Sequence, residues 1–467
     1  MTKSIPPLDL LWLLIESPVS TTHVGAMLLF KKPPGRTAVV REIVDAYRGY
    51  RPVPPFTYVP DLVGGGGPHF RQLEDWDPVY HVQHLALPAE SSYEDLLRLV
   101  AELHEPMLDR DRPLFRCAVI DAVPGGRFAI YTKTHHSIVD GASGLKMLYA
   151  GLSLSEEHTV PEPAFALRPP PPTARPAVPF VQRITDSLRG VVTQVWAVNE
   201  VSMGALRKTL TGLVGAHLEG SLPFMAQHAP TNEPLKRGRR FATLSLPLEQ
   251  MRRIGHHFSA TLNDVAVAVV DAGLHAYLRE TGRAFPHPFI AMCPVSLRDD
   301  GDAAIGTRAS AMFVRLGDPA AGAPERLTQV VDSVAAGKKE LRGMSSDAAM
   351  TYAVGIIGLA GLTASTHLDR VGRPAANLVI SNVPGARETR YLNGARLLGI
   401  YPVSALAASI GLNVTLSSYH DHTDFGFVAN AAAIDDLSSL SGHTLWFPPN
   451  RGGFLYAASR SGAAAFS

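Results

Sequence analysis

The chain has 467 residues, and its formal net charge at pH 7 is +1 because 43 basic and 42 acidic side chains nearly cancel. This balance excludes a strongly basic nucleic-acid-binding surface, while 46% hydrophobic residues are enough to fill two or three domain cores. The two cysteines, Cys117 and Cys293, are too few for a disulfide framework. We therefore expect a reducing, cytoplasmic setting and two small core residues.

An amphipathic helix is predicted close to the N-terminus. Apolar residues recur at positions 8, 11, 12 and 15, and Pro7 suits the first helical turn. Asp9 and Glu16 interrupt the apolar run and no small-residue cleavage site follows it, so it is not expected to be an export signal. A further helix is predicted after Ser91–Glu94, which has the spacing of a capping box, with positions 96, 99, 100 and 103 on its apolar face.

The segment HHSIVDG, residues 135–141, is the most informative stretch of the chain. The β-branched and aromatic residues of 127–134 predict a strand before it, and residues 141–149 predict a turn entering a helix. Successive side chains of an extended segment point to opposite faces, so only one of His135 and His136 can face a substrate. We expect His136 to be a general base and His135 to pack.

A histidine in this position indicates acyl transfer to a hydroxyl group. An alcohol rarely ionises at neutral pH, and a histidine with a pKa of about 6.5 can take its proton and return it. We expect Asp140 to hold the turn through an ion pair, with Arg298 as candidate partner, and Gly141 to form the bend. The HxxxD spacing also fits part of a metal site, but no third ligand is suitably spaced, so no metal is expected.

A proline-rich connector is predicted over residues 161–180, because prolines at this density cannot continue a helix or a central strand. It separates an N-terminal half, residues 1–160, from a C-terminal half, residues 181–467. Residues 181–218 indicate a helical stretch with glycine interruptions, and the tail from about residue 445 is expected to be irregular.

The densest positive run consists of Lys236, Arg237, Arg239 and Arg240. A solvated loop explains such a run, and so does the binding of phosphate groups or of an anionic lipid surface.

Asn263 stands at the expected start of a helix over residues 264–279, beside a capping-type pair of Thr261 and Asp264. Capping of this helix explains the segment. A catalytic role explains it equally, since the Asn263 amide could donate to a thioester carbonyl or fix the general base.

Two other segments carry open alternatives. Residues 348–365 are the most apolar stretch but are marginal in length for a membrane span, so a buried or interfacial helix is expected. Ser381 and Asn382 end an apolar strand that starts at residue 378. They are expected either to bind substrate or to satisfy the backbone of the turn that follows.

Several motifs occur in the order that is typical of one bacterial enzyme family. They are PLDLLW (7–12), THVG (22–25), LDRDRPLF (108–115), HHSIVDG (135–141), TLNDV (261–265), PVSLR (294–298), NLVISNVPG (377–385) and GLNVT (411–415). Over roughly residues 5–435 the chain resembles bacterial wax ester synthase/acyl-CoA:diacylglycerol acyltransferases. The motif HHxxxDG alone is also typical of the wider superfamily of CoA-dependent acyltransferases and peptide-synthetase condensation domains.

This resemblance implies an α/β (α+β) fold in which two chloramphenicol-acetyltransferase-like halves share an interdomain channel. It implies an O-acyltransferase that moves a fatty acyl group from the co-substrate acyl-CoA to a diacylglycerol or a long-chain alcohol, without a bound cofactor. A condensation-type acyltransferase with another donor or acceptor, and a non-catalytic lipid-binding relative, stay open as alternatives. Apolar substrates would draw such an enzyme to a membrane or lipid inclusion as a peripheral protein, where the basic run would meet CoA phosphates or lipid.

Overall fold

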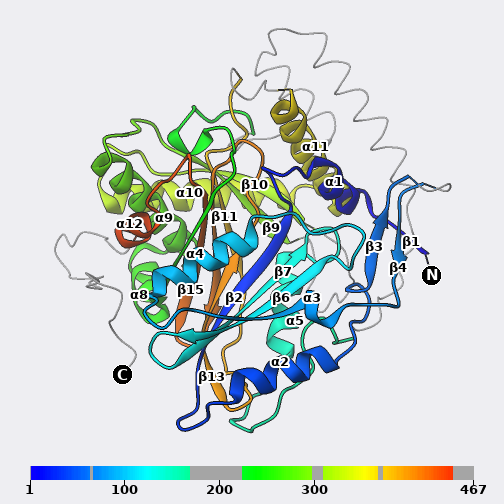
Figure 1. Ribbon diagram of the computed structural model, residues 1–467. Coiled ribbons are helices and arrows are strands. Elements are labelled where there is room, and N and C mark those ends of the chain that lie inside the picture. Colours follow the sequence, from blue (N-terminus) through cyan, green and yellow to red (C-terminus); the bar gives the residue numbers. More distant parts are fainter. Residues whose placement is uncertain (1, 64–66, 169–222, 297–308, 367–371, 445–467) are drawn as a thin grey trace.

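Two six-stranded mixed sheets form the framework of the molecule (Figure 1). The structure is a computed structural model that describes residues 2–63, 67–168, 223–296, 309–366 and 372–444. Arg298, the segment 181–218 and the tail from residue 445 lie outside these ranges, as does the predicted connector after residue 168. The predicted α/β fold of two halves is confirmed.

The sheets combine strands that are distant in sequence. The first sheet has the order β12 (Tyr391–Leu392), β13 (Ala395–Val403), β2 (His23–Lys31), β7 (Arg127–His135), β6 (Phe115–Val123) and β5 (Val82–Ala86). The second has the order β10 (Ala309–Arg315), β9 (Ile290–Ser296), β11 (Leu378–Val383), β14 (Leu412–Tyr419), β15 (His422–Asn430) and β8 (Arg239–Pro247). A small third sheet contains β1 (Thr2–Ser4), β4 (His69–Gln72) and β3 (Tyr58–Asp61).

Strand β13 joins the C-terminal part of the chain to the N-terminal sheet. It pairs antiparallel with β2, from Val403 opposite Gly25 to Arg396 opposite Lys31. Eight of its nine residues are buried, as expected for an apolar strand that is covered on both faces. The two sheets therefore do not divide the chain at the proline-rich segment.

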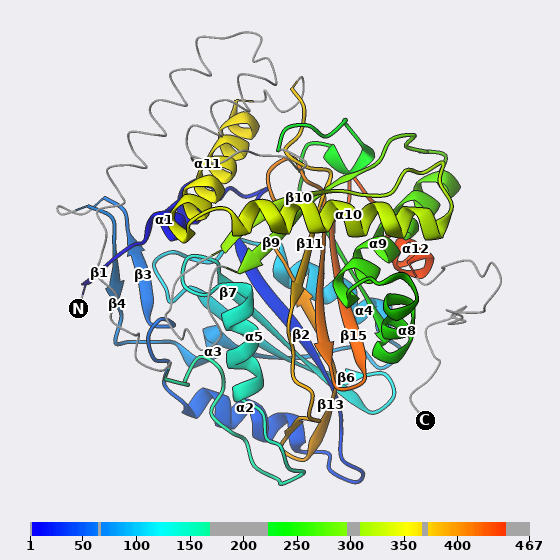
Figure 2. The same cartoon turned by 180° about the vertical axis from the view of Figure 1, so that it is seen from behind.

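Helices pack against both sheets (Figure 2). The helices are α1 (Pro7–Ile15), α2 (Val39–Gly49), α3 (Pro78–His81), α4 (Tyr93–His104), α5 (Gly141–Ala150), α8 (Leu248–Phe258), α9 (Leu262–Glu280), α10 (Ala323–Arg342), α11 (Ser346–Ser365) and α12 (Leu437–His443). Helices α2 and α5 share a core with the first sheet, and α8, α9, α10 and α12 share one with the second. Cys117 and Cys293 are free and buried in these two cores, as expected.

Helix α4 begins one residue later than the predicted cap. Ser92, not Ser91, is the N-cap, and its partner is Asp95 rather than Glu94. The Asp95 N–H donates to Ser92 Oγ at 3.2 Å, and the Ser92 N–H donates to Asp95 Oδ2 at 2.8 Å. Ser92 and Asp95 form the capping box that was predicted for Ser91 and Glu94. The prediction of a capping box was therefore correct, but its position was wrong by one residue.

The two sheets meet along β13 and β15. A Cβ at Gly426 would lie 1.8 Å from the Pro402 carbonyl oxygen, so only glycine allows the strands to approach this closely. Buried Asp424 accepts a hydrogen bond from the Ile400 N–H at 2.9 Å across the same seam. The halves are therefore packed directly against each other.

Helices α1 and α11 lie side by side in both views (Figures 1 and 2). Buried Leu8 of α1 packs with Val354 of α11, and a Cβ at Gly361 would lie 2.9 Å from Ile15 Cγ2. Among the described residues, Ala348–Ser365 is the one helical stretch long and apolar enough to span a membrane, and 28% of it is buried. One side of α11 is thus fixed by packing.

Candidate active site

The motif HHSIVDG lies on the turn between β7 and α5. Strand β7 ends at His135, the His136 backbone N–H donates to the Thr22 carbonyl oxygen at 2.9 Å, and α5 begins at Gly141. The predicted strand-to-helix turn is confirmed. Because both flanking elements are packed in the core, the turn holds His136 in a fixed position.

The two histidines point to opposite sides of this turn. His136 lines a large cavity and is half-buried, whereas His135 is 0% exposed. His135 Nδ1 lies 2.8 Å from Ser137 Oγ, and its Nε2 lies 3.1 Å from Thr22 Oγ1. Both ring nitrogens of His135 are therefore engaged by the protein, as the predicted packing role requires.

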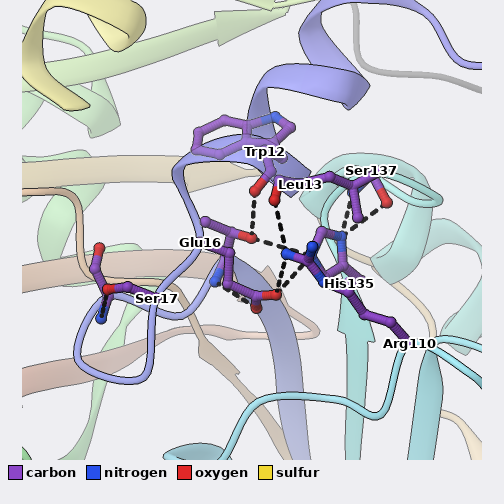
Figure 3. A network of polar contacts seen from close by, with 9 residues as sticks. Trp12, Leu13, Glu16, Ser17, Arg110, His135 and Ser137 are labelled. Atoms are coloured by element: carbon purple, nitrogen blue, oxygen red, sulfur yellow. Dashed lines mark hydrogen bonds and ion pairs between the residues drawn. The ribbon is translucent and has the colours of Figure 1, made fainter. Parts of the chain in front are cut away.

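A buried carboxylate, Glu16, lies beside His135 (Figure 3). Glu16 Oε2 is 3.4 Å from His135 Nε2 and accepts from Arg110 Nη2 at 3.0 Å. Burial raises the pKa of Glu16, but hydrogen bonds from His135, Arg110 and the Thr22 backbone outweigh this and lower it. Glu16 thus remains an anion and pairs with the Arg110 cation, whose side chain is partly exposed.

Trp12 connects this network to His136. The indole stacks on the His136 imidazole, with ring centroids 4.6 Å apart and an interplanar angle of 26°. Thr22 Oγ1 donates to the Trp12 carbonyl oxygen at 3.0 Å, and Arg110 Nη2 donates to the Leu13 carbonyl oxygen at 2.6 Å. These bonds fasten α1 to the residue before β2 and to the segment before β6, so Trp12 is held against the His136 ring and restricts its orientation.

Trp12, Thr22, Arg110 and Glu16 were not among the predicted site residues. The first three lie inside the motifs PLDLLW, THVG and LDRDRPLF, so the family resemblance that these motifs carry was the available signal. Glu16 lies outside every motif. The only sequence signal for Glu16 was that an acidic residue follows directly after the apolar helix.

Burial lowers the pKa of His136 below its usual value of 6.5. The nearby Asp140 carboxylate and a hydrogen bond to the histidine backbone act in the opposite direction, and His135 lowers the pKa further. Burial prevails, so His136 is neutral at pH 7. This is the form that can accept a proton.

Asp140 is the N-cap of α5. Its Oδ1 accepts from the Ser143 N–H at 2.9 Å and its Oδ2 accepts from Ser143 Oγ at 3.1 Å. The carboxylate therefore holds the turn through the helix cap, while its expected partner Arg298 lies outside the described residues. Gly141 lines the cavity, and a Cβ there would meet no atom within 4 Å. A larger side chain at this position would occupy space next to the motif.

His136 faces a cavity of about 340 Å³ between the two halves. Its walls come from α1, β2, β6, β7 and α5 on one side and from β9, β10, α11, β11 and β14 on the other, with the end of β13 between them. Most of the residues that line the cavity are apolar. The arginine, histidine and aspartate residues that line it are Arg116, His136 and Asp140. The expected shared channel corresponds to this cavity, which suits an apolar chain.

Strand β11 delivers Ser381 and Asn382 to the same cavity. Ser381 stands opposite Thr415 of β14, which also lines it. Asn382 is exposed and Ser381 is half-buried, so polar groups of the second sheet reach the space that His136 faces. This placement favours substrate contact over a purely local turn.

Asn263 is not among the residues that line this cavity. It lies in the first turn of α9, where Thr261 and Asp264 form the predicted capping box. Helix α9 packs against α8, α10 and α12 as well as the second sheet. The structure therefore does not bring Asn263 to His136, and the capping alternative accounts for the segment.

The basic run is divided by burial. Lys236, Arg237 and Arg240 are exposed, whereas Arg239 is buried and donates to the Val19 carbonyl oxygen at 2.5 Å. Burial lowers the pKa of Arg239. Arg239 is thus a structural residue that ties the loop to the segment after α1, and the other three cations face solvent.

Comparison with known proteins agrees with this arrangement. Residues 5–266 match the wax ester synthase/diacylglycerol acyltransferase catalytic domain, and residues 305–444 match the C-terminal domain of the same family. The chain is similar to the O-acyltransferase WSD of Acinetobacter baylyi, at 31% identity over 94% of this chain and 95% of the relative.

Solved structures show the same relationship at the level of the fold. The wax ester synthase/diacylglycerol acyltransferase from Marinobacter aquaeolei VT8 is 27% identical, with a TM-score of 0.74 over 95% of this chain and 97% of that one. The first condensation domain of the CDA synthetase, at 15% identity and a TM-score of 0.55 over 95% and 96% of the two chains, shares the fold alone.

Proposed function

Because the chain belongs to the wax ester synthase/diacylglycerol acyltransferase family, we propose that it transfers a fatty acyl group from acyl-CoA to a long-chain alcohol or a diacylglycerol. The observation that carries the proposal is the neutral imidazole of His136 in an apolar cavity built by both halves. An apolar lining favours a fatty acyl chain over water next to a thioester.

His136 acts as the general base of a direct acyl transfer. It takes the proton of the acceptor hydroxyl as the oxygen attacks the thioester carbon, and the tetrahedral adduct then collapses with cleavage of the carbon–sulfur bond. CoA leaves as a thiolate, to which His136 returns the proton, so no acyl-enzyme is needed. Trp12 keeps the imidazole oriented, and Ser381 and Asn382 supply polar groups that position the substrates.

The test is a product analysis with defined substrates. Palmitoyl-CoA is supplied with hexadecanol or diolein, and free CoA is measured together with the ester formed. Equal amounts of CoA and ester support the proposal. Release of CoA without ester would instead indicate a thioesterase, and no release with any acceptor would indicate a lipid-binding protein.

We also propose that the protein meets its apolar substrates at a lipid surface. Leu14 of α1 is 64% exposed and Val19 is 37% exposed. Arg239, at the start of β8 and next to the exposed cations Lys236, Arg237 and Arg240, donates to the Val19 carbonyl oxygen. Exposed apolar side chains such as Leu14 and Val19, close to exposed cations, are typical of surfaces that bind anionic membranes. Leu14→Glu should lower the fraction bound to anionic vesicles roughly tenfold, while His136→Ala should co-sediment as the parent does.

A further inference from the structure

Three polar side chains form a hydrogen-bonded chain on the wall of the cavity. Asn413 Nδ2 donates to the Ala405 carbonyl oxygen at 2.7 Å, Thr415 Oγ1 lies 3.0 Å from Asn413 Oδ1, and Ser404 Oγ lies 2.8 Å from Thr415 Oγ1. Asn413 and Thr415 are buried, Ser404 is half-buried, and all three line the cavity that His136 faces. Neither the base nor the positioning groups described above explain this chain.

The direction of each hydrogen bond in this chain is fixed by one backbone group. A carbonyl oxygen can only accept, so the Asn413 amide must turn its nitrogen to Ala405 and its oxygen to Thr415. Thr415 has one hydroxyl proton and must give it to Asn413. Ser404 must therefore donate its own proton to Thr415, which leaves Ser404 Oγ able only to accept.

The chain consequently offers one acceptor and one donor to a ligand. The acceptor is Ser404 Oγ, and the donor is the second N–H of Asn413, which has no other partner among the residues that the structure describes. The N–H and C=O of one trans secondary amide point in opposite directions, so a single amide does not reach both groups on one wall. A wall that offers an acceptor and a separate donor instead complements two successive amides, of which one gives its N–H and the other its carbonyl oxygen. It does not complement a diacylglycerol or a long-chain alcohol, which have no donor besides the reacting hydroxyl.

We propose that Ser404 and Asn413 bind the two secondary amides in the pantetheine arm of acyl-CoA, with Ser404 accepting from the N–H of one and Asn413 donating to the carbonyl oxygen of the other. This inference rests on the proposed function, because acyl-CoA is the substrate that brings such amides into the cavity. Thr415 acts through Ser404, since it fixes the hydroxyl in its accepting orientation. The location fits, because Thr415 stands opposite Ser381 on the wall contributed by the second half.

The test compares one variant with two acyl donors. Ser404→Ala removes the acceptor, and its kcat/KM with palmitoyl-CoA and hexadecanol should fall roughly 2- to 10-fold, the usual range for one hydrogen bond. With S-ethyl thiopalmitate, which has no amide, the same variant should match the parent protein. This second assay also reports that the variant is folded. An equal fall with both donors, or a fall in apparent affinity for hexadecanol alone, would overturn the inference.

A matched control is Ser310→Ala. Ser310 lines the same cavity, but its hydroxyl donates to the Ala349 carbonyl oxygen at 2.9 Å, so we expect any effect to be the same for both donors. Binding of CoA itself, measured by calorimetry, separates this inference from the proposed function. Ser404→Ala should weaken CoA binding roughly 2- to 10-fold even if no ester were ever formed, and unchanged CoA affinity would contradict the pantetheine contact.

Discussion

The two faces of the last residues of β7 differ in what surrounds them. On one face, Thr132, Thr134 and His136 border the cavity. On the other, Lys133 and His135 are buried and their polar atoms are engaged by the protein. Lys133 Nζ donates to three backbone carbonyl oxygens, and burial lowers its pKa to about 7.

This difference shows how one residue type takes two roles at adjacent positions. Strand alternation sends neighbouring imidazoles to opposite faces, and the surroundings then decide what each can do. His135 lies between Glu16, Thr22 and Ser137 and is held in place. His136 has one ring face against Trp12 and borders open space, so it can meet a substrate.

The largest expected effect is the loss of turnover when His136 is removed. His136→Ala should lower kcat by roughly two to four orders of magnitude, the usual contribution of a general base. Its free energy of unfolding, measured in urea, should stay close to that of the parent protein. Near-normal turnover in a folded His136→Ala protein would assign the base elsewhere.

Removal of the Glu16 charge should affect stability more than any other change on the buried face. Glu16→Leu removes the buried acceptor of the Thr22 N–H, of His135 and of the partly exposed Arg110, at a cost of about 1.5–3 kcal/mol in the free energy of unfolding. Glu16→Gln is the matched control, because it keeps an acceptor for Arg110 and should lose less. If Glu16→Leu unfolded at the parental urea concentration but had no activity, Glu16 would belong to the chemistry.

His135→Ala should lower stability and largely spare turnover, whereas His136→Ala should lower turnover and largely spare stability. The variant leaves polar groups of Thr22 and Ser137 without their imidazole partner, at a cost of about 1–3 kcal/mol. Its kcat, measured at a temperature where it is folded, should stay within roughly tenfold of the parent. A loss of turnover as large as that of His136→Ala would remove the distinction between the two faces.

The exposed cations should have the smallest effect on turnover. Replacing Lys236, Arg237 and Arg240 by glutamine, with buried Arg239 retained, should weaken binding to anionic vesicles by about 1 kcal/mol per charge that meets the surface. The Michaelis constant for acyl-CoA should not change. A raised constant with normal vesicle binding would assign the run to CoA phosphates instead.

Local patterns in the sequence predicted the elements that position the base. Alternation over residues 127–134, the glycine at 141 and the capping pair of Thr261 and Asp264 are local signals, and they correspond to β7, α5 and α9. The family and its fold followed from the order of the motifs. These features depend on neighbours in the chain, which a sequence displays directly.

The remaining parts of the site depend on contacts between distant segments. Glu16 meets Arg110 and His135 only after folding, and Ser404 meets Thr415 only because β13 crosses to the first sheet while β14 stays in the second. Asn263 illustrates the limit of a local signal, since its sequence fits a helix cap and a catalytic position equally, and only the fold shows that it does not line the cavity. Periodicity contains no information about which distant side chains share a cavity.

The pH dependence of kcat/KM in the parent protein and in Asp140→Asn tests most directly whether His136 is the base. Asparagine retains the N-cap of α5 but removes the carboxylate that raises the pKa of His136. Because a base is active only when deprotonated, activity should fall as the pH drops through the pKa of His136. We expect this limb below pH 6.5 in the parent protein and at a still lower pH in Asp140→Asn. A limb at or above pH 6.5, or one that Asp140→Asn does not move, would contradict the assignment of His136 as the base.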